Sequence, residues 1–145
     1  MKTVDIFYLE KKYADEMRAH AVSEAPDECC GILAGTNNNV VKIYRTTNTE
    51  HSPSKYKINS QEMFSIYKEI RENRWELLGV YHSHVHTAAY PSPTDVKSAL
   101  LPEAIYFIIS LRDSERVVIR GFYINKGKIT EIELRITGYY VPSTR

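Results

Sequence analysis

The sequence predicts a layered α/β (α+β) domain in which helices flank a mixed β-sheet. Short runs rich in β-branched and aromatic residues alternate with segments whose apolar residues recur at helical spacing. Helices interleaved with strands in this way are typical of layered domains. The length of 145 residues is enough for one domain with a core of its own. We therefore expect a single domain over residues 1–137, followed by a C-terminal tail at 138–145.

The first half of the chain is predicted to begin with a strand and a helix. Val4–Leu9 is rich in β-branched and aromatic residues, and in Lys11–Glu24 the apolar residues keep helical spacing until Pro26 ends the helix. The next apolar run has no alternation, which is typical of a strand covered on both faces. A polar turn then leads into another strand, and these segments form a hairpin: Glu28–Gly35, Thr36–Asn39 and Val40–Thr46.

The second half opens with the polar segment Thr47–Ser54 and a predicted short strand at Tyr56–Ile58. Ser60 can cap a helix that runs to about Asn73. One face of this helix is expected to carry Met63, Phe64, Tyr67 and Ile70. The remaining elements are a buried strand, a loop, a short helix and three strands: Glu76–His82, His84–Pro91, Ser92–Leu101, Ala104–Leu111, Glu115–Tyr123 and Lys128–Ile136.

Charge, hydropathy and cysteine content exclude several classes of function. Nineteen basic against eighteen acidic residues give a net charge of +1, so no general attraction to nucleic acid or to an anionic membrane is expected. The longest apolar run, Ala104–Leu111, is well short of the roughly 20 residues of a membrane-spanning helix. The N-terminus lacks the apolar stretch of a secretory signal, and the only cysteines, Cys29 and Cys30, are adjacent. These features predict a cytoplasmic protein and leave its oligomeric state open.

Three histidines lie within five residues, as His82, His84 and His86 in the segment YHSHVH. Clustered imidazoles indicate a metal site, because their nitrogens suit zinc and similar ions. If the preceding apolar run is a strand, His82 and His84 share one face at its end. A hydrolytic metal needs three protein ligands and an open position, so a third ligand is required. Asp95, in the first turn of the following helix, is the best candidate, and His86 is its competitor.

A metal-activated water also needs a base. Glu28 stands at the start of a strand that we expect to be buried, where an acid requires an explanation. Burial would raise the pKa of its carboxyl group towards a value useful for proton transfer. Glu28 is therefore the candidate general acid/base.

These residues together form a pattern: Glu28, then His82-Ser83-His84, then seven residues, then Ser92, two residues and Asp95. The pattern and its flanking segments PDECCGILAG and GVYHSH resemble the JAMM (MPN+) metalloprotease family, in particular its small prokaryotic members. The resemblance spans roughly residues 4 to 123. One departure is Val85, where many relatives have a proline, and it concerns the shape of the loop rather than the ligands.

The resemblance implies a JAMM/MPN-like curved sheet with a layering broadly similar to that of cytidine deaminases. It implies one Zn²⁺ per chain bound by His82, His84 and Asp95, with Glu28 as general acid/base and Ser92 as donor to the oxyanion. The implied reaction is hydrolysis of an amide bond after the C-terminal Gly-Gly of a ubiquitin-like or sulfur carrier protein. Such a tail is typically bound in an extended form beside an edge strand.

Other interpretations accompany each of these. His82 and His84 can be strand-end histidines bonded to the backbone, Ser92 and Asp95 can simply cap a helix, and Glu28 can be a carboxylate at a strand edge. His86 is expected to be a loop residue, and the two cysteines are expected to be small core residues.

Three other functions were compared with the peptidase. A non-catalytic MPN scaffold is the alternative function, and the intact pattern argues against it. A zinc deaminase is disfavoured because its His-x-Glu and Pro-Cys-x-x-Cys motifs are absent. A DNA-associated relative is disfavoured by the balanced charge.

Overall fold

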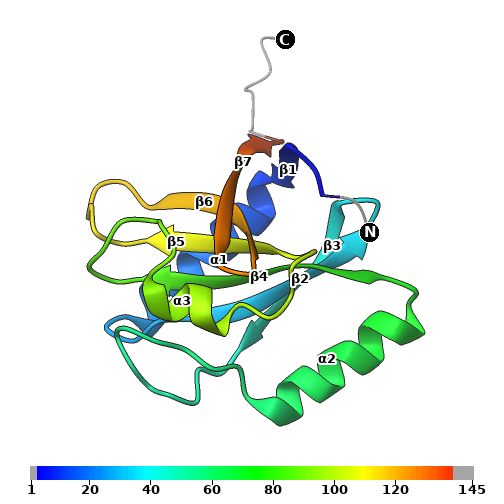
Figure 1. Cartoon of the computed structure of the whole chain (residues 1–145), viewed down its shortest axis with the longest axis horizontal. Helices are drawn as coiled ribbons and strands as arrows, with labels where there is room; N and C mark the ends of the chain where they lie inside the picture. The colour runs from blue at the N-terminus through cyan, green and yellow to red at the C-terminus, as the bar shows by residue number, and fades with distance from the viewer. Residues whose placement is uncertain (1–2, 139–145) are drawn as a thin grey trace, which may run out of the picture.

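The computed structural model describes residues 3–138 and has the layered architecture that the sequence predicts (Figure 1). In chain order, its elements are β1 (Ile6–Glu10), α1 (Lys11–Glu24), β2 (Cys30–Thr36), β3 (Asn39–Thr46), α2 (Ser60–Glu72), β4 (Glu76–His84), α3 (Pro93–Ser98), β5 (Ile105–Ser110), β6 (Val118–Asn125) and β7 (Lys128–Thr137). Of the tail expected at 138–145, all but Gly138 lies outside the described residues.

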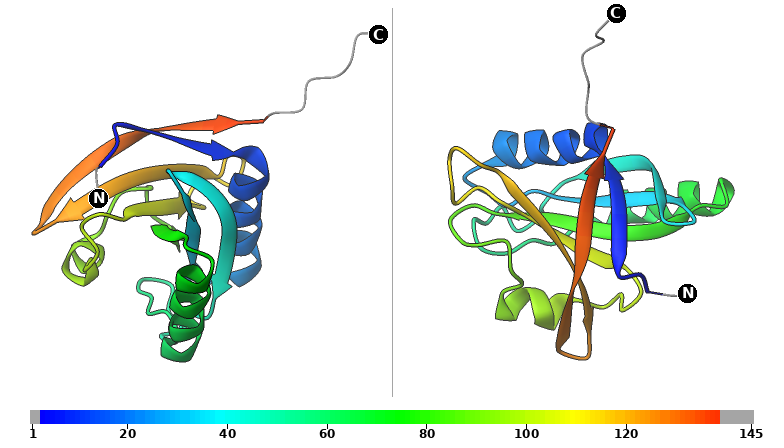
Figure 2. Two further views of the ribbon diagram at one scale, coloured as in Figure 1. Left: turned by 90° about the vertical axis from the view of Figure 1, so that its right-hand side faces the viewer. Right: turned by 90° about the horizontal axis from the view of Figure 1, so that it is seen from above.

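The strands form one seven-stranded sheet in the order β1-β7-β6-β5-β4-β2-β3. The pairs β1–β7 and β4–β5 are parallel and the other pairs are antiparallel, so the sheet is mixed. Its strong curvature is visible in both views of Figure 2. The predicted fold class is confirmed. The strand that carries the histidine pair, β4, lies between β2 and β5 and has no free edge.

Strand β5 explains why the sheet is covered on both faces. All six of its residues are buried, and alternate residues belong to two separate core clusters. Ile105, Phe107 and Ile109 pack in the cluster that includes α1, whereas Tyr106 and Ile108 pack in the cluster that includes α2 and α3. Helix α1 therefore covers one face, and the two later helices lie at the other (Figure 2).

The glycine in β2 permits a close contact on the face covered by α1. Gly31 pairs with Tyr81 across β2 and β4, and a Cβ atom at Gly31 would lie 2.1 Å from the Tyr81 ring. A side chain there would collide with the ring, so Gly31 leaves room for the large buried aromatic residue.

The helices agree with the sequence analysis except in two details of α2. Helix α1 has the predicted bounds. Helix α2 is capped by Asn59 rather than Ser60, since the Asn59 side chain accepts hydrogen bonds from the N–H groups of Gln61 and Glu62. The expected apolar face was confirmed at Ile70, which is buried, but wrong at Phe64, which is 71% exposed, because Ile66 is buried instead.

Three predicted segment ends or strands differ from the structure. The expected strand Tyr56–Ile58 is an extended segment with only one bridge, between Asn48 and Ile58. Strand β6 begins at Val118 rather than Glu115, because Asp113 folds the preceding residues into a turn through bonds to the N–H groups of Glu115 and Arg116. Helix α3 ends at Ser98 rather than Leu101.

Strand β4 is longer than predicted and extends through His84. His84 pairs with Ser110 of β5, and its carbonyl accepts a hydrogen bond from the N–H of Leu111. The histidine pair therefore belongs to the sheet and not to the loop. Among residues 3–138, no helix is long and apolar enough to cross a membrane.

Candidate metal centre

Three potential ligand atoms meet where β4 ends and α3 begins. The Nε2 atoms of His82 and His84 are 3.2 Å apart, and the Asp95 Oδ2 lies 3.1 Å from the first and 2.9 Å from the second. All three side chains are buried. Within the described part of the chain, they form the one group of histidine, cysteine and acidic residues arranged to hold a metal ion.

The separations fit a small four-coordinate ion. Metal–ligand bonds of about 2.0–2.1 Å in a tetrahedron place neighbouring ligand atoms roughly 3.3 Å apart. Two imidazole nitrogens and one carboxylate oxygen are also the donor set of open zinc sites. The three residues therefore fit a zinc ion and leave one coordination position without a side-chain ligand from this group.

Three hydrogen bonds orient two of the candidate ligands, His84 and Asp95. The Nδ1 of His84 donates to the carbonyl oxygen of Ala88 at 2.8 Å, which directs the Nε2 lone pair towards the ligand cluster. The N–H of Ser92 donates to the Asp95 Oδ2 at 2.9 Å, and the Asp95 N–H donates to the Ser92 Oγ at 3.1 Å. Helix α3 therefore begins with a capping box whose acid also takes part in the cluster.

Burial and mutual attraction shift the pKa values of the cluster. Burial lowers the pKa of His82. Burial also opposes ionisation of Asp95, but its hydrogen bonds to His82 and His84 outweigh this and hold the Asp95 pKa below its usual range. For His84, burial is outweighed by the Asp95 carboxylate, so the pKa is raised. The cluster is thus an anionic carboxylate facing two imidazoles, which is the charge distribution that favours a cation.

Glu28 lies beside the cluster because of the register between β2 and β4. Cys30 pairs with His82 in this antiparallel ladder, so residue 28 falls opposite His84 and on the same face. Ser83 fixes this register, because its N–H donates to the Cys29 carbonyl and its Oγ accepts from the Cys29 N–H. The carboxylate of Glu28 is consequently brought to the ligands from a distant part of the sequence.

The Glu28 carboxyl group is buried and incompletely paired. It is 3% exposed, and among the described residues its Oε1 has no hydrogen-bond partner. Burial raises its pKa to about 8, with the negative charge of Asp95 adding to the effect and His84 opposing it. A carboxyl group with a pKa near neutrality can both accept and release a proton. The buried His82 Nδ1 is the other unpartnered side-chain atom in the described residues.

Asn48 holds the backbone around Glu28. Its Nδ2 donates to the carbonyls of Glu28 and Lys55, both at 3.0 Å, and its Oδ1 accepts from the N–H groups of Glu50 and Lys57. The N–H of Glu28 is also bonded, to the Ser52 carbonyl at 2.8 Å. The polar segment that follows β3 therefore acts as a clamp on the strand that delivers Glu28.

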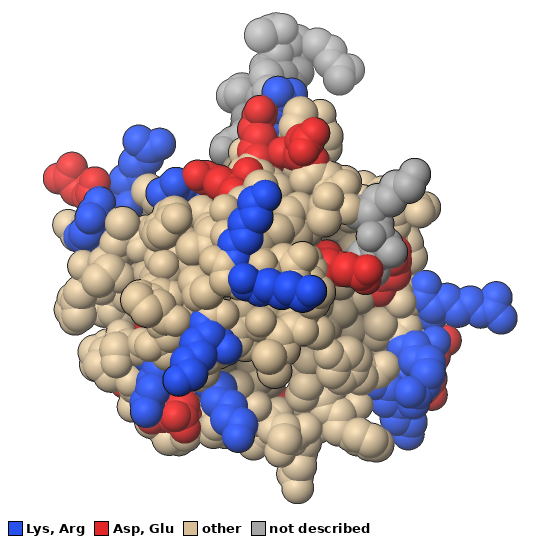
Figure 3. Space-filling view, viewed as in Figure 1, with Lys and Arg blue, Asp and Glu red and all other residues tan. Residues whose placement is uncertain are grey.

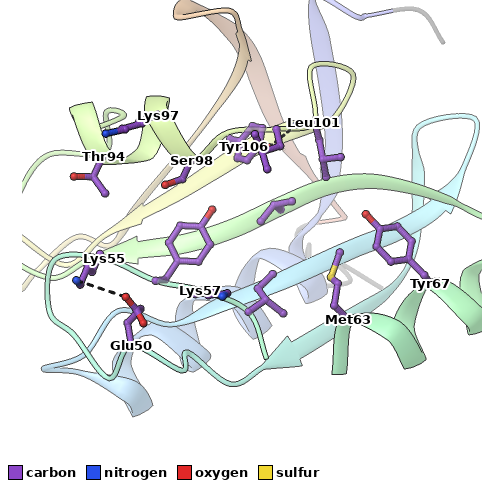
Figure 4. A pocket seen from close by; sticks show the side chains of 14 residues that line it. Glu50, Lys55, Lys57, Met63, Tyr67, Thr94, Lys97, Ser98, Leu101 and Tyr106 are labelled. Carbon is purple, nitrogen blue, oxygen red and sulfur yellow. Dashed lines mark hydrogen bonds and ion pairs between the residues drawn. The ribbon is translucent and has the colours of Figure 1, made fainter. Parts of the chain in front are cut away.

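A groove of about 580 Å³ lies near the cluster, with Thr94, the neighbour of Asp95, among its lining residues (Figure 4). One wall is formed by Lys55, Lys57, Met63 and Tyr67, and the other by the helix α3 and the segment after it, as Figure 4 shows. Tyr56 lines the same groove, and its ring stacks on His82 with the centroids 4.4 Å apart. The Tyr56 ring therefore links the groove to His82.

The remaining residues from the sequence analysis lie apart from the cluster. His86 is exposed and does not belong to the ligand group. Cys29 and Cys30 are buried free thiols, and burial raises their pKa values to about 12 and about 11. Such thiols stay protonated at neutral pH and are poor nucleophiles.

Sequence reasoning missed Asn48, Tyr56 and the supporting role of Ser83. An asparagine in a turn-rich segment is a weak signal, because such residues usually bond only to their own turn. Tyr56 stood in a segment predicted as a strand, where an aromatic residue needs no special explanation. The roles of Asn48 and Tyr56 can be recognised only in the tertiary structure, where the segment after β3 packs beside Glu28 and His82.

Comparison with known proteins agrees with this arrangement. The model for prokaryotic homologs of the JAB domain matches residues 10–122. The protein named CysO-cysteine peptidase from Mycobacterium tuberculosis is 35% identical over 140 residues, covering 95% of this chain and 96% of that protein. The protein named desampylase from Pyrococcus furiosus is 27% identical over 113 residues, covering 78% of this chain and 79% of that protein.

Solved structures have the same fold. Protein DSY2949 from Desulfitobacterium hafniense superposes with a TM-score of 0.82 at 35% identity, covering 92% of this chain and 94% of that one. AF2198, a JAB1/MPN domain protein from Archaeoglobus fulgidus, superposes with a TM-score of 0.56 at 15% identity, covering 88% and 95%, and shows a likeness of fold. The resemblance indicated by the histidine motif is confirmed. Because the family match covers most of its length, this chain belongs to the prokaryotic JAB-domain family.

Proposed function

We propose that this protein is a zinc-dependent peptidase. Its reaction is hydrolysis of the amide bond after the C-terminal Gly-Gly of a ubiquitin-like or sulfur carrier protein, within a single domain over residues 1–137. The observation that carries the proposal is the convergence of His82, His84 and Asp95 beside the buried carboxyl group of Glu28, whose Oε1 has no hydrogen-bond partner among residues 3–138. A structural carboxyl group would be paired, whereas one kept free beside a cation site is available for proton transfer.

Zinc bound by the three ligands would supply a water of lowered pKa and an electrophile for the substrate carbonyl. Glu28 takes the proton of the attacking water and delivers it to the leaving amine. The raised pKa of about 8 suits both steps, since the group exchanges a proton near neutral pH.

Ser92 is proposed as the donor to the developing oxyanion. Its Oγ already accepts the N–H of Asp95, so its own hydrogen stays available for donation. The capping box fixes the Ser92 side chain at the start of α3, three residues before Asp95. A preorganised donor of this kind strengthens its bond as the carbonyl oxygen gains charge.

The extended segment at Tyr56–Ile58 supports an extended substrate tail in the groove. At the bridge between Asn48 and Ile58, the Lys57 carbonyl accepts from the Thr49 N–H, and the Asn59 N–H donates to the Thr47 carbonyl. These backbone groups therefore point towards residues 47–49. In an extended chain, the backbone groups of Tyr56 and Ile58 point the other way, and no described residue bonds to them. These outward backbone groups can form hydrogen bonds with an extended substrate tail. In this proposal, the segment Tyr56–Ile58 takes the role of the edge strand that the family resemblance implies.

The relatives support the proposed substrate class. Proteins named CysO-cysteine peptidase and desampylase match this chain over most of their length. A Gly-Gly tail suits a narrow path to the cluster, because glycine allows close backbone approach.

The test is direct. Zinc-loaded protein is incubated with a sulfur carrier protein that has a C-terminal extension after Gly-Gly, and intact masses are recorded. We expect the extension to be lost with the wild type, and the Glu28→Gln variant to be slower by roughly 10²- to 10⁴-fold because it keeps the ligands but cannot carry a proton. Glu24→Gln, an exposed acid on α1, is the matched control and should cleave normally.

The outcomes separate the alternatives. Full activity in Glu28→Gln would remove Glu28 from the mechanism. One zinc per chain without cleavage of any carrier would favour the non-catalytic scaffold. Absence of stoichiometric zinc in the wild type would contradict the proposal altogether.

A further inference from the structure

We propose that Tyr56 is a positioning residue of the metal centre. Its ring holds the imidazole of His82 in the orientation that places Nε2 within the ligand group, and it does so without a hydrogen bond. The inference rests on the zinc site of the proposed function. It adds to that site a residue from a different segment of the chain, the extended segment after β3.

The two histidines of the cluster are held differently. A metal-ligating histidine usually uses its second ring nitrogen in a hydrogen bond that fixes the ring. His84 follows this rule, since its Nδ1 is bonded to the Ala88 carbonyl at 2.8 Å. The Nδ1 of His82 is buried, and among residues 3–138 it has no hydrogen-bond partner. Rotamer preference sets the torsion about Cβ–Cγ only loosely, so the orientation of the His82 ring depends on what packs against it.

Ring contacts supply this restraint. The Tyr56 ring stacks on His82 with the centroids 4.4 Å apart and the ring planes 21° apart. The His84 ring meets the His82 ring edge to face, with the centroids 5.0 Å apart. Turning the His82 imidazole about its Cβ–Cγ bond would tilt one ring edge into Tyr56, so the stack resists this rotation. In the stacked orientation, the His82 Nε2 lies 3.1 Å from the Asp95 Oδ2, within the ligand group.

The backbone on both sides of Tyr56 is anchored by Asn48. The Asn48 side chain donates to the Lys55 carbonyl at 3.0 Å and accepts from the Lys57 N–H at 3.1 Å. Lys55 and Lys57 are exposed, and charged side chains project outwards from this face in Figure 3. Tyr56 lies between them in the extended chain, is half-buried and packs against the core cluster that includes α2. The anchored backbone therefore presents the ring to His82.

The alternative role for Tyr56 is only to fill space in the core. Loss of its ring would lower stability under either role, so stability alone cannot separate them. The hydroxyl group can be removed by itself, because it has no hydrogen-bond partner among residues 3–138. Tyr56→Phe keeps the ring, and Tyr56→Leu removes it. Tyr44→Leu is the matched control, because Tyr44 packs against the same cluster and its ring stacks on no histidine of the described chain.

The test measures the metal site without any substrate. Competition with a chromophoric chelator gives the zinc affinity, and the visible absorption of Co²⁺ bound in place of zinc reports the ligand geometry. We expect Tyr56→Phe to match the wild type in both measurements. Tyr56→Leu should bind zinc roughly 3- to 10-fold more weakly, as for loss of an aromatic pair, and should alter the Co²⁺ spectrum. Tyr44→Leu should be less stable in urea as the metal-free protein but should keep the wild-type affinity and spectrum.

Three results would overturn the inference. They are a wild-type affinity and spectrum in Tyr56→Leu, an equal loss of affinity in Tyr44→Leu, and an equal loss of affinity in Tyr56→Phe. If Tyr56→Leu does not fold, Tyr56→Met takes its place, because methionine fills the space with a flexible chain and has no flat ring. A wild type that binds no zinc would contradict the proposed function together with this inference. Equal zinc binding by the wild type and Tyr56→Leu would remove only the positioning role.

Discussion

Buried polar groups lie against both faces of the sheet near β4, but their hydrogen bonding differs between the two faces. On the face covered by α1, the buried His20 Nδ1 is hydrogen-bonded to the Tyr81 hydroxyl at 2.7 Å. On the opposite face, Glu28 and His82 each have one buried side-chain atom without a hydrogen-bond partner among residues 3–138, and both imidazoles lie close to the Asp95 carboxylate. We call the face with the hydrogen-bonded His20 and Tyr81 the satisfied face. The face with Glu28 and His82 is the unsatisfied face.

The comparison separates stability from function. A buried polar group that has its partner contributes modestly to folding, whereas an unpaired one costs free energy. The satisfied face is therefore expected to matter for stability alone. Under the proposed function, the unsatisfied face would retain its cost because a cation and a substrate would complete it. Each substitution below changes one face, and zinc affinity or stability is then measured.

The largest effect is expected for Asp95→Ala. The substitution removes the anionic ligand, so zinc affinity should fall by more than about 100-fold, since loss of an outer partner alone costs roughly 10- to 100-fold. Competition with a chromophoric chelator measures the affinity. His86→Ala is the control and should bind zinc like the wild type. Full zinc affinity in Asp95→Ala combined with loss in His86→Ala would move the third ligand to His86.

Asn48→Ala should lower the stability of the backbone that supports the unsatisfied face. It removes four hydrogen bonds and leaves the buried Glu28 carbonyl without one donor, so the free energy of unfolding should fall by about 2–3 kcal/mol. Urea unfolding of the metal-free protein provides the value. The exposed Asn73→Ala, which loses one bond at the end of α2, should cost much less. Equal losses for the two variants would contradict the clamp.

Tyr81→Phe should affect only the satisfied face. It leaves the buried His20 without its hydroxyl partner and should cost about 1–2 kcal/mol, with zinc affinity unchanged. Thermal unfolding and the chelator assay measure the two quantities. Tyr13→Phe, on the half-buried side of α1, serves as the matched control. A drop in zinc affinity of Tyr81→Phe would show that the two faces are coupled.

The smallest effect is a pH dependence from His20. Burial lowers the pKa of His20 in the folded chain, so below about pH 6.5 the unfolded chain binds the proton more readily. Stability is therefore lost as pH falls through the unfolded pKa, by on the order of 1 kcal/mol. His20→Asn should lose this dependence. Urea unfolding at pH 7.5 and 5.5 in chelator compares the two proteins, and parallel curves would exclude the effect.

The sequence predicted much of the fold because local periodicity and local packing agree along most of the chain. Helix α1 was predicted with its bounds, since its apolar spacing and the following proline give the same answer. Phe64 and the segment Tyr56–Ile58 were predicted wrongly because their apolar character was read as burial in the core or the sheet. In the structure, Phe64 is exposed and Tyr56 instead lines a groove and packs on His82. Aromatic residues at such surfaces cannot be told from core residues by spacing alone.

The sequence by itself determined the donor chemistry and its local spacing. His82 and His84 are two residues apart on one strand and so share a face. Ser92 and Asp95 lie together at the start of one helix. Both relations follow from strand and helix periods, which act over a few residues. The tertiary structure alone decided what these groups meet. Cys29 and Ser83, which set the position of Glu28, are 54 residues apart, and no local period relates them. Sheet register, burial and the bonds of Asn48 act through space, and they decided that Glu28 lies buried beside the candidate ligands, with no partner for its Oε1 in the described part of the chain.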